Sequence, residues 1–312
     1  MGRVKPGPSS DKGYNMTLVT FFQQLLNGVS LGSLYSLLAI GYTLVYGILG
    51  LINFAHSDVF MLGTYFTFFV IGIFVLPWWL SVVIAMGLCA LVGMTIERVA
   101  YRPLRSAPRI SALITAVGVS FFIQNLGLVT VGARPKGFPR PELMENVYSL
   151  FGIRIQGVVV WVPIISGVIL LFLLYIIYRT KTGMAMRAVA KDMEATRLMG
   201  VNVDRIILYT FALGSAIAAA GGAMWAARYP QINPLMGIFP GWKAFTAAVV
   251  GGIGNVVGAM IGGMIIGIAE IMIPAAFPGL TGYRDAFVFA ILIGFLLIKP
   301  SGILGEAQKE KV

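Results

Sequence analysis

One polar cluster interrupts the apolar stretches of this 312-residue chain and contains its only histidine. The cluster is Ile52-Asn53-Phe54-Ala55-His56-Ser57-Asp58. Its imidazole and carboxylate groups could relay a proton or line a path for a polar solute, because ionisable groups in apolar surroundings usually face a cavity or a partner. A simpler interpretation is that Asp58 caps the helix that follows, with the cluster at a membrane interface. One histidine and one carboxylate are too few ligands for a metal site, so we predict none.

Two motifs bear on enzymatic function. Gly28-Val-Ser-Leu-Gly32 matches the G-x-S-x-G pattern of hydrolases, but that pattern requires a strand-to-helix turn and a histidine partner. An intramembrane enzyme built on it would need Ser30 and His56 within hydrogen-bond reach. The chain also has no G-x-x-x-x-G-K-[ST] phosphate loop, so it does not hydrolyse a nucleotide by that mechanism. We predict no catalytic residue and no cofactor in this chain.

The composition determines which kind of fold must position these residues. The chain is 58% hydrophobic and 11% charged, whereas a soluble globular protein carries about 25% charged residues. Lipid must therefore be the solvent for much of its surface. The apolar stretches are continuous and lack the alternating polarity of barrel strands, so the sequence predicts helices, whose backbone groups bond internally.

Hydropathy along the chain gives the elements. Before residue 56, the stretch Thr17–Ala55 is long enough for about two crossings, with turns among its glycines. A shorter apolar piece, Trp242–Gly252, is predicted to be a re-entrant half-helix. We therefore predict an all-α polytopic membrane protein with about eight transmembrane helices and one half-helix. The clear spans are Val59–Val75, Trp78–Ile96, Ser111–Val131, Val158–Tyr178, Ile206–Ala227, Val256–Ile273 and Ala286–Ile298.

Basic residues set the expected orientation. Of the 23 Lys and Arg residues, 16 lie in the N-terminal tail and in one set of loops, and 7 lie on the opposite side. The richer side is predicted to be cytoplasmic. The net charge of +11 then reflects topology, with anionic lipid headgroups as the nearest partners and no nucleic acid. Glu270, near the end of an apolar run, is expected to be solvated, and we find no convincing pair of buried charges.

The stretch Arg179–Arg205 is the longest predicted cytoplasmic loop. Its alternation of apolar and charged residues is typical of one or two short amphipathic helices that end at Gly200. Such helices lie on the bilayer or dock into a groove on a partner, and the pattern alone favours neither. The predicted domains are a disordered tail over 1–15, a membrane domain over 16–305 and a cytoplasmic tail over 306–312.

Several segments together resemble permeases of the LivH type, which are subunits of bacterial ABC importers for branched-chain amino acids. The similarity runs from about Met16 to the C-terminus, although the residue after His56 is glycine in that pattern and Ser57 here. It is carried by Leu26-Asn-Gly-Val-Ser-Leu-Gly-Ser-Leu-Tyr35, Ile40-Gly-Tyr-Thr-Leu-Val-Tyr-Gly47, Ile52-Asn-Phe-Ala-His56, Ile96-Glu-Arg-Val-Ala-Tyr-Arg-Pro-Leu-Arg105, Lys243-Ala-Phe-Thr-Ala-Ala-Val-Val-Gly-Gly-Ile-Gly254, Gly258-Ala-Met-Ile-Gly-Gly263 and Pro300-Ser-Gly-Ile-Leu-Gly305.

The resemblance implies a multi-pass protein of the bacterial inner membrane that imports Leu, Ile or Val. It implies a second, LivM-like permease, two cytoplasmic ATPases that bind ATP and Mg²⁺, and a periplasmic or lipid-anchored substrate-binding protein. It also implies that the loop 179–205 couples this chain to an ATPase. The residues expected in that contact are Arg187, Ala190, Asp192, Glu194, Ala195, Leu198 and Gly200.

A path for the substrate is expected where small residues let helices move against each other. The candidate path and gating residues are Tyr42, Asn53, His56, Gly251, Gly252, Gly254 and Gly258. Two alternatives remain open. One is a permease of a related importer for urea, short amides or other amino acids. The other is a stand-alone secondary transporter or channel, which would require paired charges inside the membrane.

Overall fold

The structure is a computed structural model that describes residues 18–105, 107–150 and 153–305. The predicted tails over 1–15 and 306–312 lie outside these residues. Within them, eight helices are long and apolar enough to cross a membrane, which confirms the predicted all-α polytopic fold. The crossings are Leu18–Leu49, His56–Phe74, Trp78–Leu104, Ile110–Val131, Gly157–Arg179, Val203–Arg228, Val256–Ala276 and Pro278–Ile298.

The first helix, α1 (Leu18–Leu49), is a single unbroken element of 32 residues. The prediction of two crossings within Thr17–Ala55 is therefore wrong. At 1.5 Å per residue the helix is about 48 Å long, more than the hydrocarbon core of about 30 Å requires. Its glycines lie within the helix, and several of them allow neighbouring helices to pack closely against it. A side chain at Gly32 would come within 2.9 Å of the Met264 backbone of α11 (Val256–Ala276).

The ends of α1 show which way it runs. Near its start, Gln23 Nε2 donates to the carbonyl of Arg154 in the hairpin of β2 (Val147–Leu150) and β3 (Ile153–Gln156), at 3.1 Å. Near its end, Thr43, Leu44 and Gly47 share a small cavity with Arg187 of α7 (Lys181–Lys191). The helix thus crosses once, from the hairpin end to the α7 end. The N-terminal tail was predicted to lie on the side of the loop 179–205 because two crossings were expected before residue 56. With a single crossing, that argument no longer holds.

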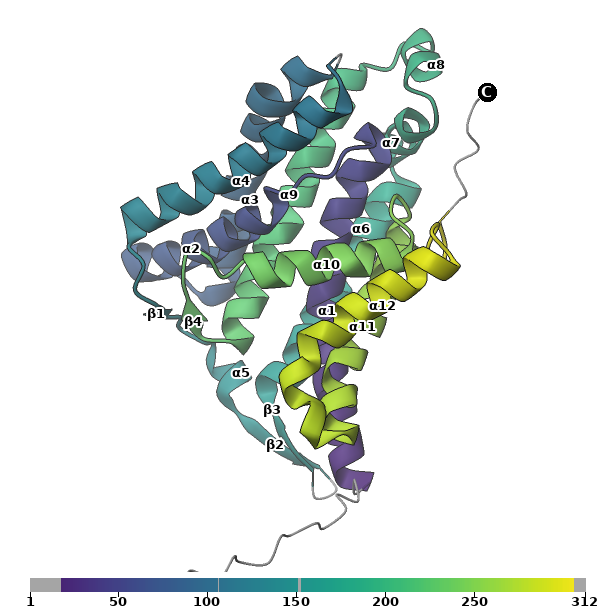
Figure 1. Ribbon diagram of the computed structural model, residues 1–312. Coiled ribbons are helices and arrows are strands. Elements are labelled where there is room, and N and C mark those ends of the chain that lie inside the picture. Colours follow the sequence, from purple (N-terminus) through teal and green to yellow (C-terminus); the bar gives the residue numbers. More distant parts are fainter. Residues whose placement is uncertain (1–17, 106, 151–152, 306–312) are drawn as a thin grey trace, which may run out of the picture.

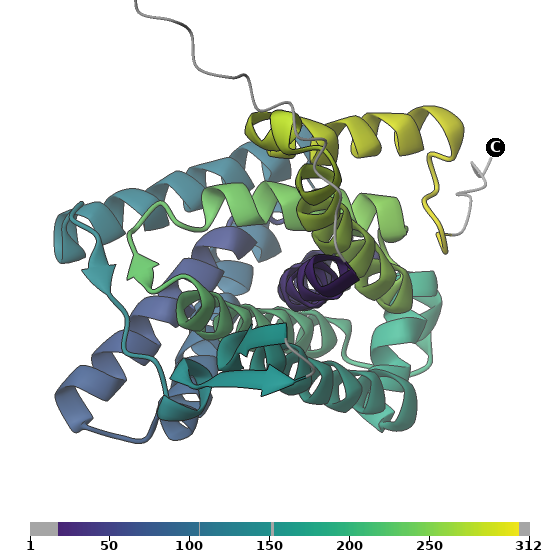
Figure 2. The same cartoon turned by 90° about the horizontal axis from the view of Figure 1, so that it is seen from below.

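The remaining long helices surround α1, which lies at the centre when the molecule is viewed from the hairpin end (Figure 2). α1 packs most extensively along α11 and also contacts α9, α6 and α10. The most apolar part of α1 is 94% buried, whereas that of the last span is 6% buried. The last helix packs along α10 and α11 and leaves its other side to lipid or to another subunit. The long helices not yet bounded are α2 (His56–Phe74), α3 (Trp78–Ile96), α4 (Arg109–Val131), α6 (Gly157–Arg179), α9 (Val203–Arg228) and α12 (Arg284–Ile298).

Short elements complete the two ends. At the hairpin end, β1 pairs antiparallel with β4, and β2 pairs antiparallel with β3. At the other end, α3 continues into a π-helical turn and then a 3-10 turn. The short elements not yet bounded are η1 (Glu97–Tyr101), η2 (Arg102–Leu104), β1 (Lys136–Gly137), α5 (Glu142–Glu145), α8 (Met193–Leu198), β4 (Gln231–Ile232) and η3 (Pro278–Tyr283).

Helix α10 (Ile238–Gly251) is the predicted re-entrant segment. Its 14 residues span about 21 Å, too little to cross, and it lies obliquely across the middle of the bundle (Figure 1). Gly252 (φ 108°) and Gly254 (φ 96°) turn the chain from α10 into α11, which favours glycine at both positions. Backbone groups freed at this turn bond to the C-terminal segment: the amides of Ile303 and Leu304 donate to the carbonyls of Val250 and Gly251 at 2.9 and 3.0 Å. Protein thus covers the broken backbone, as a membrane interior requires.

Candidate functional site

The polar cluster after α1 lies inside the helix bundle. Helix α2 begins at His56, whose ring packs so closely on Gly41 of α1 that a Cβ there would overlap it. Gly41 lies about two turns before the end of α1, so the chain after Leu49 returns into the bundle before α2 starts. His56 is 1% exposed and its ring centre lies 4.9 Å from that of Tyr42. The cluster therefore lies between helices inside the bundle, and its position at the membrane interface stays a prediction.

Asp58 does not cap α2. The residue at the cap position is Ala55, and no side chain caps this helix. The Asp58 carboxylate is 1% exposed and accepts hydrogen bonds from α4, from Ser120 Oγ at 2.5 Å and Gln124 Nε2 at 2.9 Å. These two hydrogen bonds show that the Asp58 side chain points from the first turn of α2 toward α4. The capping prediction is therefore wrong, and the carboxylate ties α2 to α4.

The other members of the cluster also have particular neighbours. Asn53 Oδ1 accepts a hydrogen bond from Tyr101 Oη at 3.0 Å, at the end of α3. His56 Nε2 has no protein hydrogen-bond partner among the described residues. Ser30 and His56 do not meet, because Ser30 lies roughly three helical turns from Gly41 along α1. The side chains that an intramembrane hydrolase would need are therefore apart.

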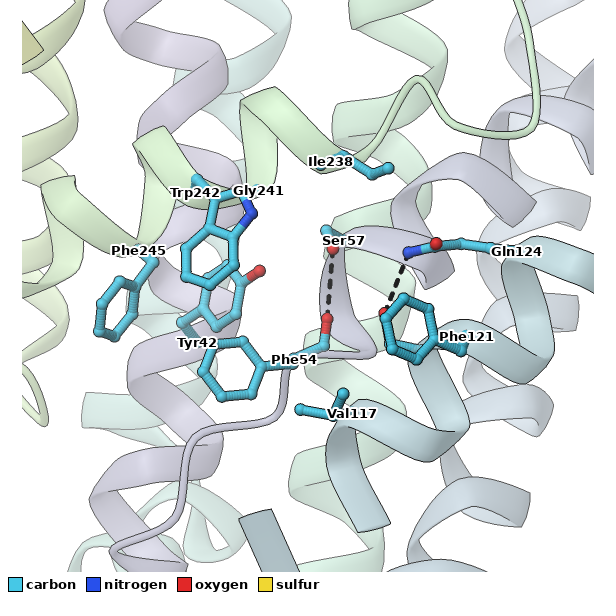
Figure 3. A pocket seen from close by; sticks show the side chains of 11 residues that line it. Tyr42, Phe54, Ser57, Val117, Phe121, Gln124, Ile238, Gly241, Trp242 and Phe245 are labelled. Atoms are coloured by element: carbon cyan, nitrogen blue, oxygen red, sulfur yellow. Dashed lines mark hydrogen bonds between the residues drawn. The ribbon is translucent and has the colours of Figure 1, made fainter. Parts of the chain in front are cut away.

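A cavity of about 280 Å³ opens beside this cluster (Figure 3). Gly241 of α10 allows the close approach of its walls: a Cβ there would lie 2.9 Å from Ser57 Oγ and 3.3 Å from Tyr42 Oη. Most of the lining is aromatic or aliphatic, with Ser57, Ser120 and Gln124 as polar groups, a mixture typical of small-molecule sites. The lining residues are Tyr42, Phe54, Ser57, Val117, Ser120, Phe121, Gln124, Ile238, Gly241, Trp242 and Phe245. We call this space the aromatic cavity.

The predicted path residues divide into two groups. Tyr42 lines the aromatic cavity, and His56 and Asn53 lie behind it. The glycines lie elsewhere: Gly251 packs backbone to backbone on Gly258, Gly252 packs on Leu304 and Gly305, and Gly254 lies beside Gly47. They pack α10 against α11, α1 and the C-terminal segment. Their part in a path stays a prediction.

The loop 179–205 forms two short helices, α7 and α8, as predicted. Thr180 Oγ1 accepts from the amide of Gly183 at the start of α7, and Asp192 Oδ1 accepts from the amides of Glu194 and Ala195 at the start of α8. Gly200 (φ 82°) ends the pair. All seven residues expected to contact an ATPase are exposed, including Arg187, Ala190 and Gly200. Leu198 and Met199 are 89% and 84% exposed, so two large apolar side chains project from this end.

Ion pairs connect the α7–α8 end of the bundle to η1, the turn that contacts the polar cluster. Asp204, at the start of α9, pairs with Arg102 at 2.8 Å and with Arg105 at 2.5 Å. Arg105 also pairs with the buried Glu97 of η1. The same turn carries Tyr101, which bonds to Asn53. The short helices are therefore linked to the polar cluster through packed and charged contacts.

A buried charge cluster is the largest departure from the sequence prediction. Lys243 and Glu270 are 4% and 2% exposed, and Lys243 Nζ lies 2.7 Å from Glu270 Oε1 and 2.6 Å from Asp285 Oδ1. Tyr35 Oη donates to Glu270 Oε2 at 2.7 Å, and Arg284 Nε lies 3.2 Å from Glu270 Oε1. The expectation that Glu270 is solvated and that no buried pair exists is wrong. A lone lysine in the half-helix and a lone glutamate in an apolar run were the available signals.

Comparison with known proteins agrees with this architecture. Residues 24–296 match the family model described as branched-chain amino acid transport system, permease component. The chain is 44% identical to the high-affinity branched-chain amino acid transport system permease protein LivH of Escherichia coli K12 and 40% identical to BraD of Pseudomonas aeruginosa, in each case over 94% of this chain and 98% of the relative. It is also 30% identical to the probable LivH of Methanocaldococcus jannaschii, over 92% of this chain and 94% of the relative. The chain therefore belongs to the family of permease components of branched-chain amino acid transport systems, and it is a multi-pass inner-membrane protein.

Proposed function

We propose that this chain forms half of the gate of an ABC importer that carries Leu, Ile or Val into the cell. ATP and Mg²⁺ are bound by two separate ATPase subunits, a LivM-like permease forms the other half, and an external binding protein delivers the substrate. The observation that carries the proposal is the aromatic cavity beside the re-entrant helix α10.

The lining of the aromatic cavity fits a branched aliphatic side chain. Rings of Phe54, Trp242 and Phe245 form an apolar wall, and Tyr42 and Gln124 supply polar groups at its edge. The cavity is also incomplete within this chain, because Phe121 and Trp242 are 60% and 47% exposed. A second permease would complete the wall, and the substrate would pass between the two chains. Because the aromatic cavity offers few polar contacts, it would bind the substrate weakly. Weak binding lets the substrate leave the cavity toward the cytoplasm.

The exposed surface of α7 and α8 suits the ATPase contact. Leu198 and Met199 would enter an apolar groove, with Arg187 and Glu194 at the polar rim. Movement of α8 would pull on the start of α9, and the pairs of Asp204 with Arg102 and Arg105 would transmit it to Tyr101 and Asn53. Two packed arrangements of these helices, each favoured by a different ligand, would give alternating access.

Uptake by the reconstituted importer tests the proposed substrate. The chain is assembled with its permease partner, ATPases and binding protein, and ATP-dependent uptake of labelled leucine is measured against unlabelled competitors. We expect Ile and Val to compete strongly and urea and alanine weakly, because only the former offer a branched side chain to the aromatic wall. Equal competition by urea would contradict the substrate assignment. Uptake by this chain alone would instead favour a secondary transporter, the class for which buried charge pairs are expected.

Narrowing the aromatic cavity should block transport. Leucine at Gly241 would press on Ser57 and Tyr42, and overpacking of this kind costs about 1–3 kcal/mol. We expect Gly241→Leu to lower leucine uptake about tenfold or more, with the subunits still assembled. Gly72→Leu in α2 is the matched control, because nothing lies within 4 Å of a Cβ at Gly72. Normal uptake by Gly241→Leu would remove the cavity from the path.

A further inference from the structure

A second cavity, of about 350 Å³, lies on the other side of α10 from the aromatic cavity. Phe239, Pro240 and Lys243 of α10 line it, whereas the neighbouring Gly241 and Trp242 line the aromatic cavity. Trp225 of α9, Tyr229 just after its end and Arg284 at the start of α12 close it. Because α9 ends beside the hairpin end of the bundle (Figure 1), this cavity lies toward that end, which the distribution of basic residues predicts to be the outer side. We call it the charged cavity.

The charged cavity contains two cations and two anions within reach of one another. Lys243 contacts both Glu270 and Asp285, and Arg284 contacts Glu270. Their formal charges sum to zero. Lys243 and Glu270 are almost fully buried, but the side chains of Arg284 and Asp285 are 47% and 48% exposed. One opposite pair is therefore fixed at the back of the cavity, and another opposite pair is accessible at its mouth.

Stability alone is a poor reason for this arrangement. Removing charges from water has a large free-energy penalty, and apolar residues of similar volume often replace a buried ion pair without loss of stability. Ionisable side chains inside a membrane domain are typically functional and line the route of a substrate or ion. Lys243 is also on the half-helix that separates the two cavities, where a bound solute would contact the element that must move for it to pass.

We propose that the charged cavity binds the ammonium and carboxylate groups of a free α-amino acid before it passes α10. The substrate carboxylate would pair with Lys243 and Arg284, and its ammonium with Glu270 and Asp285. The aliphatic side chain would lie on the rings of Trp225 and Tyr229, which line the same space. Each ion pair broken in the cluster is replaced by one with the substrate, so a zwitterion enters without adding net charge. A solute with a single charge would leave a buried partner unpaired. This inference rests on the proposed function and specifies where its substrate is recognised.

A thiol-protection assay tests the inference. Phe239 lines the charged cavity and is 64% exposed, and the chain's own Cys89 is buried. The full-length Phe239→Cys chain is placed in phosphatidylglycerol vesicles, which contain no zwitterionic headgroup, and its reaction rate with a small polar thiol reagent is measured. Millimolar leucine should slow the reaction about fivefold or more. 4-Methylpentanoate, which lacks the ammonium group, and isoamylamine, which lacks the carboxylate, should each slow it less than twofold. Leu143→Cys, in α5 away from the cavity, should not respond to leucine.

A second variant separates binding from folding. Lys243→Met with Glu270→Met replaces the buried pair by apolar side chains, and we expect protection by leucine to disappear while the protein still shows a cooperative thermal denaturation. Equal protection by leucine and by the two single-charge compounds would overturn the inference, as would protection that survives in the double variant. Slowing by phosphatidylethanolamine without leucine would identify a lipid headgroup as the occupant and also overturn it. Leucine uptake by the wild-type importer without protection at Phe239→Cys would refute this inference alone, whereas absence of uptake would refute the proposed function.

Discussion

Replacing Leu198 by Asp is expected to abolish ATP-driven uptake while the chain still inserts in the membrane. Leu198 is 89% exposed on α8, so the substitution removes no contact inside this chain. In the proposed complex the new carboxylate would be buried in an apolar groove without a partner. Substitutions at the few central residues that dominate an interface cost about 2 kcal/mol or more, which corresponds to roughly thirtyfold weaker binding. Ala195→Asp, on the same exposed helix, should act in the same direction.

Three measurements on the Leu198 variants separate coupling from folding. They are leucine uptake, co-purification of the ATPase subunits, and the amount of this chain in the membrane fraction. Leu198→Met keeps an apolar side chain of similar volume and should retain uptake within about twofold, because such swaps are tolerated. Wild-type uptake by Leu198→Asp, or ATPases that co-purify normally with it, would show that α8 is not the coupling contact.

The second large effect concerns the stability of the buried charge cluster. Lys243→Met leaves Glu270, which is 2% exposed, without its lysine partner. Breaking a buried pair on one side costs about 3–5 kcal/mol, because an uncompensated charge remains in an apolar interior. Arg284 lies 3.2 Å from Glu270 and will recover part of that loss. We therefore expect a marked fall in the denaturation midpoint of the purified protein.

The double variant Lys243→Met with Glu270→Met is the matched comparison. With both charges removed, neither is left unpaired, so we expect stability to recover most of the loss seen in the single variant. It should stay about 1–3 kcal/mol below the wild-type value, because the buried Tyr35 hydroxyl also loses its partner Glu270. Asp285 also loses its contact with Lys243, but it is half exposed and lies beside Arg284, so solvent and that guanidinium compensate it. If the double variant were as unstable as the single one, the charge cluster would stabilise the fold by itself. Its presence would then be explained without a bound ligand.

Much of the architecture followed from local properties of the sequence. Hydropathy over windows of about 20 residues located the seven later spans, and the short run Trp242–Gly252 correctly predicted the re-entrant α10. The loop 179–205 was also correctly predicted as short helices ending at Gly200. These features depend on residues a few positions apart, because span length, capping and left-handed turns are decided within one or two helical turns.

Predictions made from neighbouring residues were wrong where a residue contacts a segment far away in the sequence. Glycines in Thr17–Ala55 indicated turns, yet Gly32 and Gly41 lie within the unbroken α1 and allow α11 and His56 to approach it. Asp58 was placed as a cap because it precedes an apolar run. Its actual partners, Ser120 and Gln124, are 62 and 66 residues further along the chain. A cap and a cross-helix bond look identical in sequence.

The sequence by itself determined that the chain is a helical membrane protein of this permease family, since composition, apolar run length and the motifs are all properties of residues near one another in the chain. Only the tertiary structure decided that Tyr35, Lys243 and Glu270 meet, across separations as long as 235 residues. It also decided that two cavities lie on opposite sides of α10. Such contacts depend on which faces of which helices pack together, and close packing of side chains from distant segments is not encoded in any single stretch.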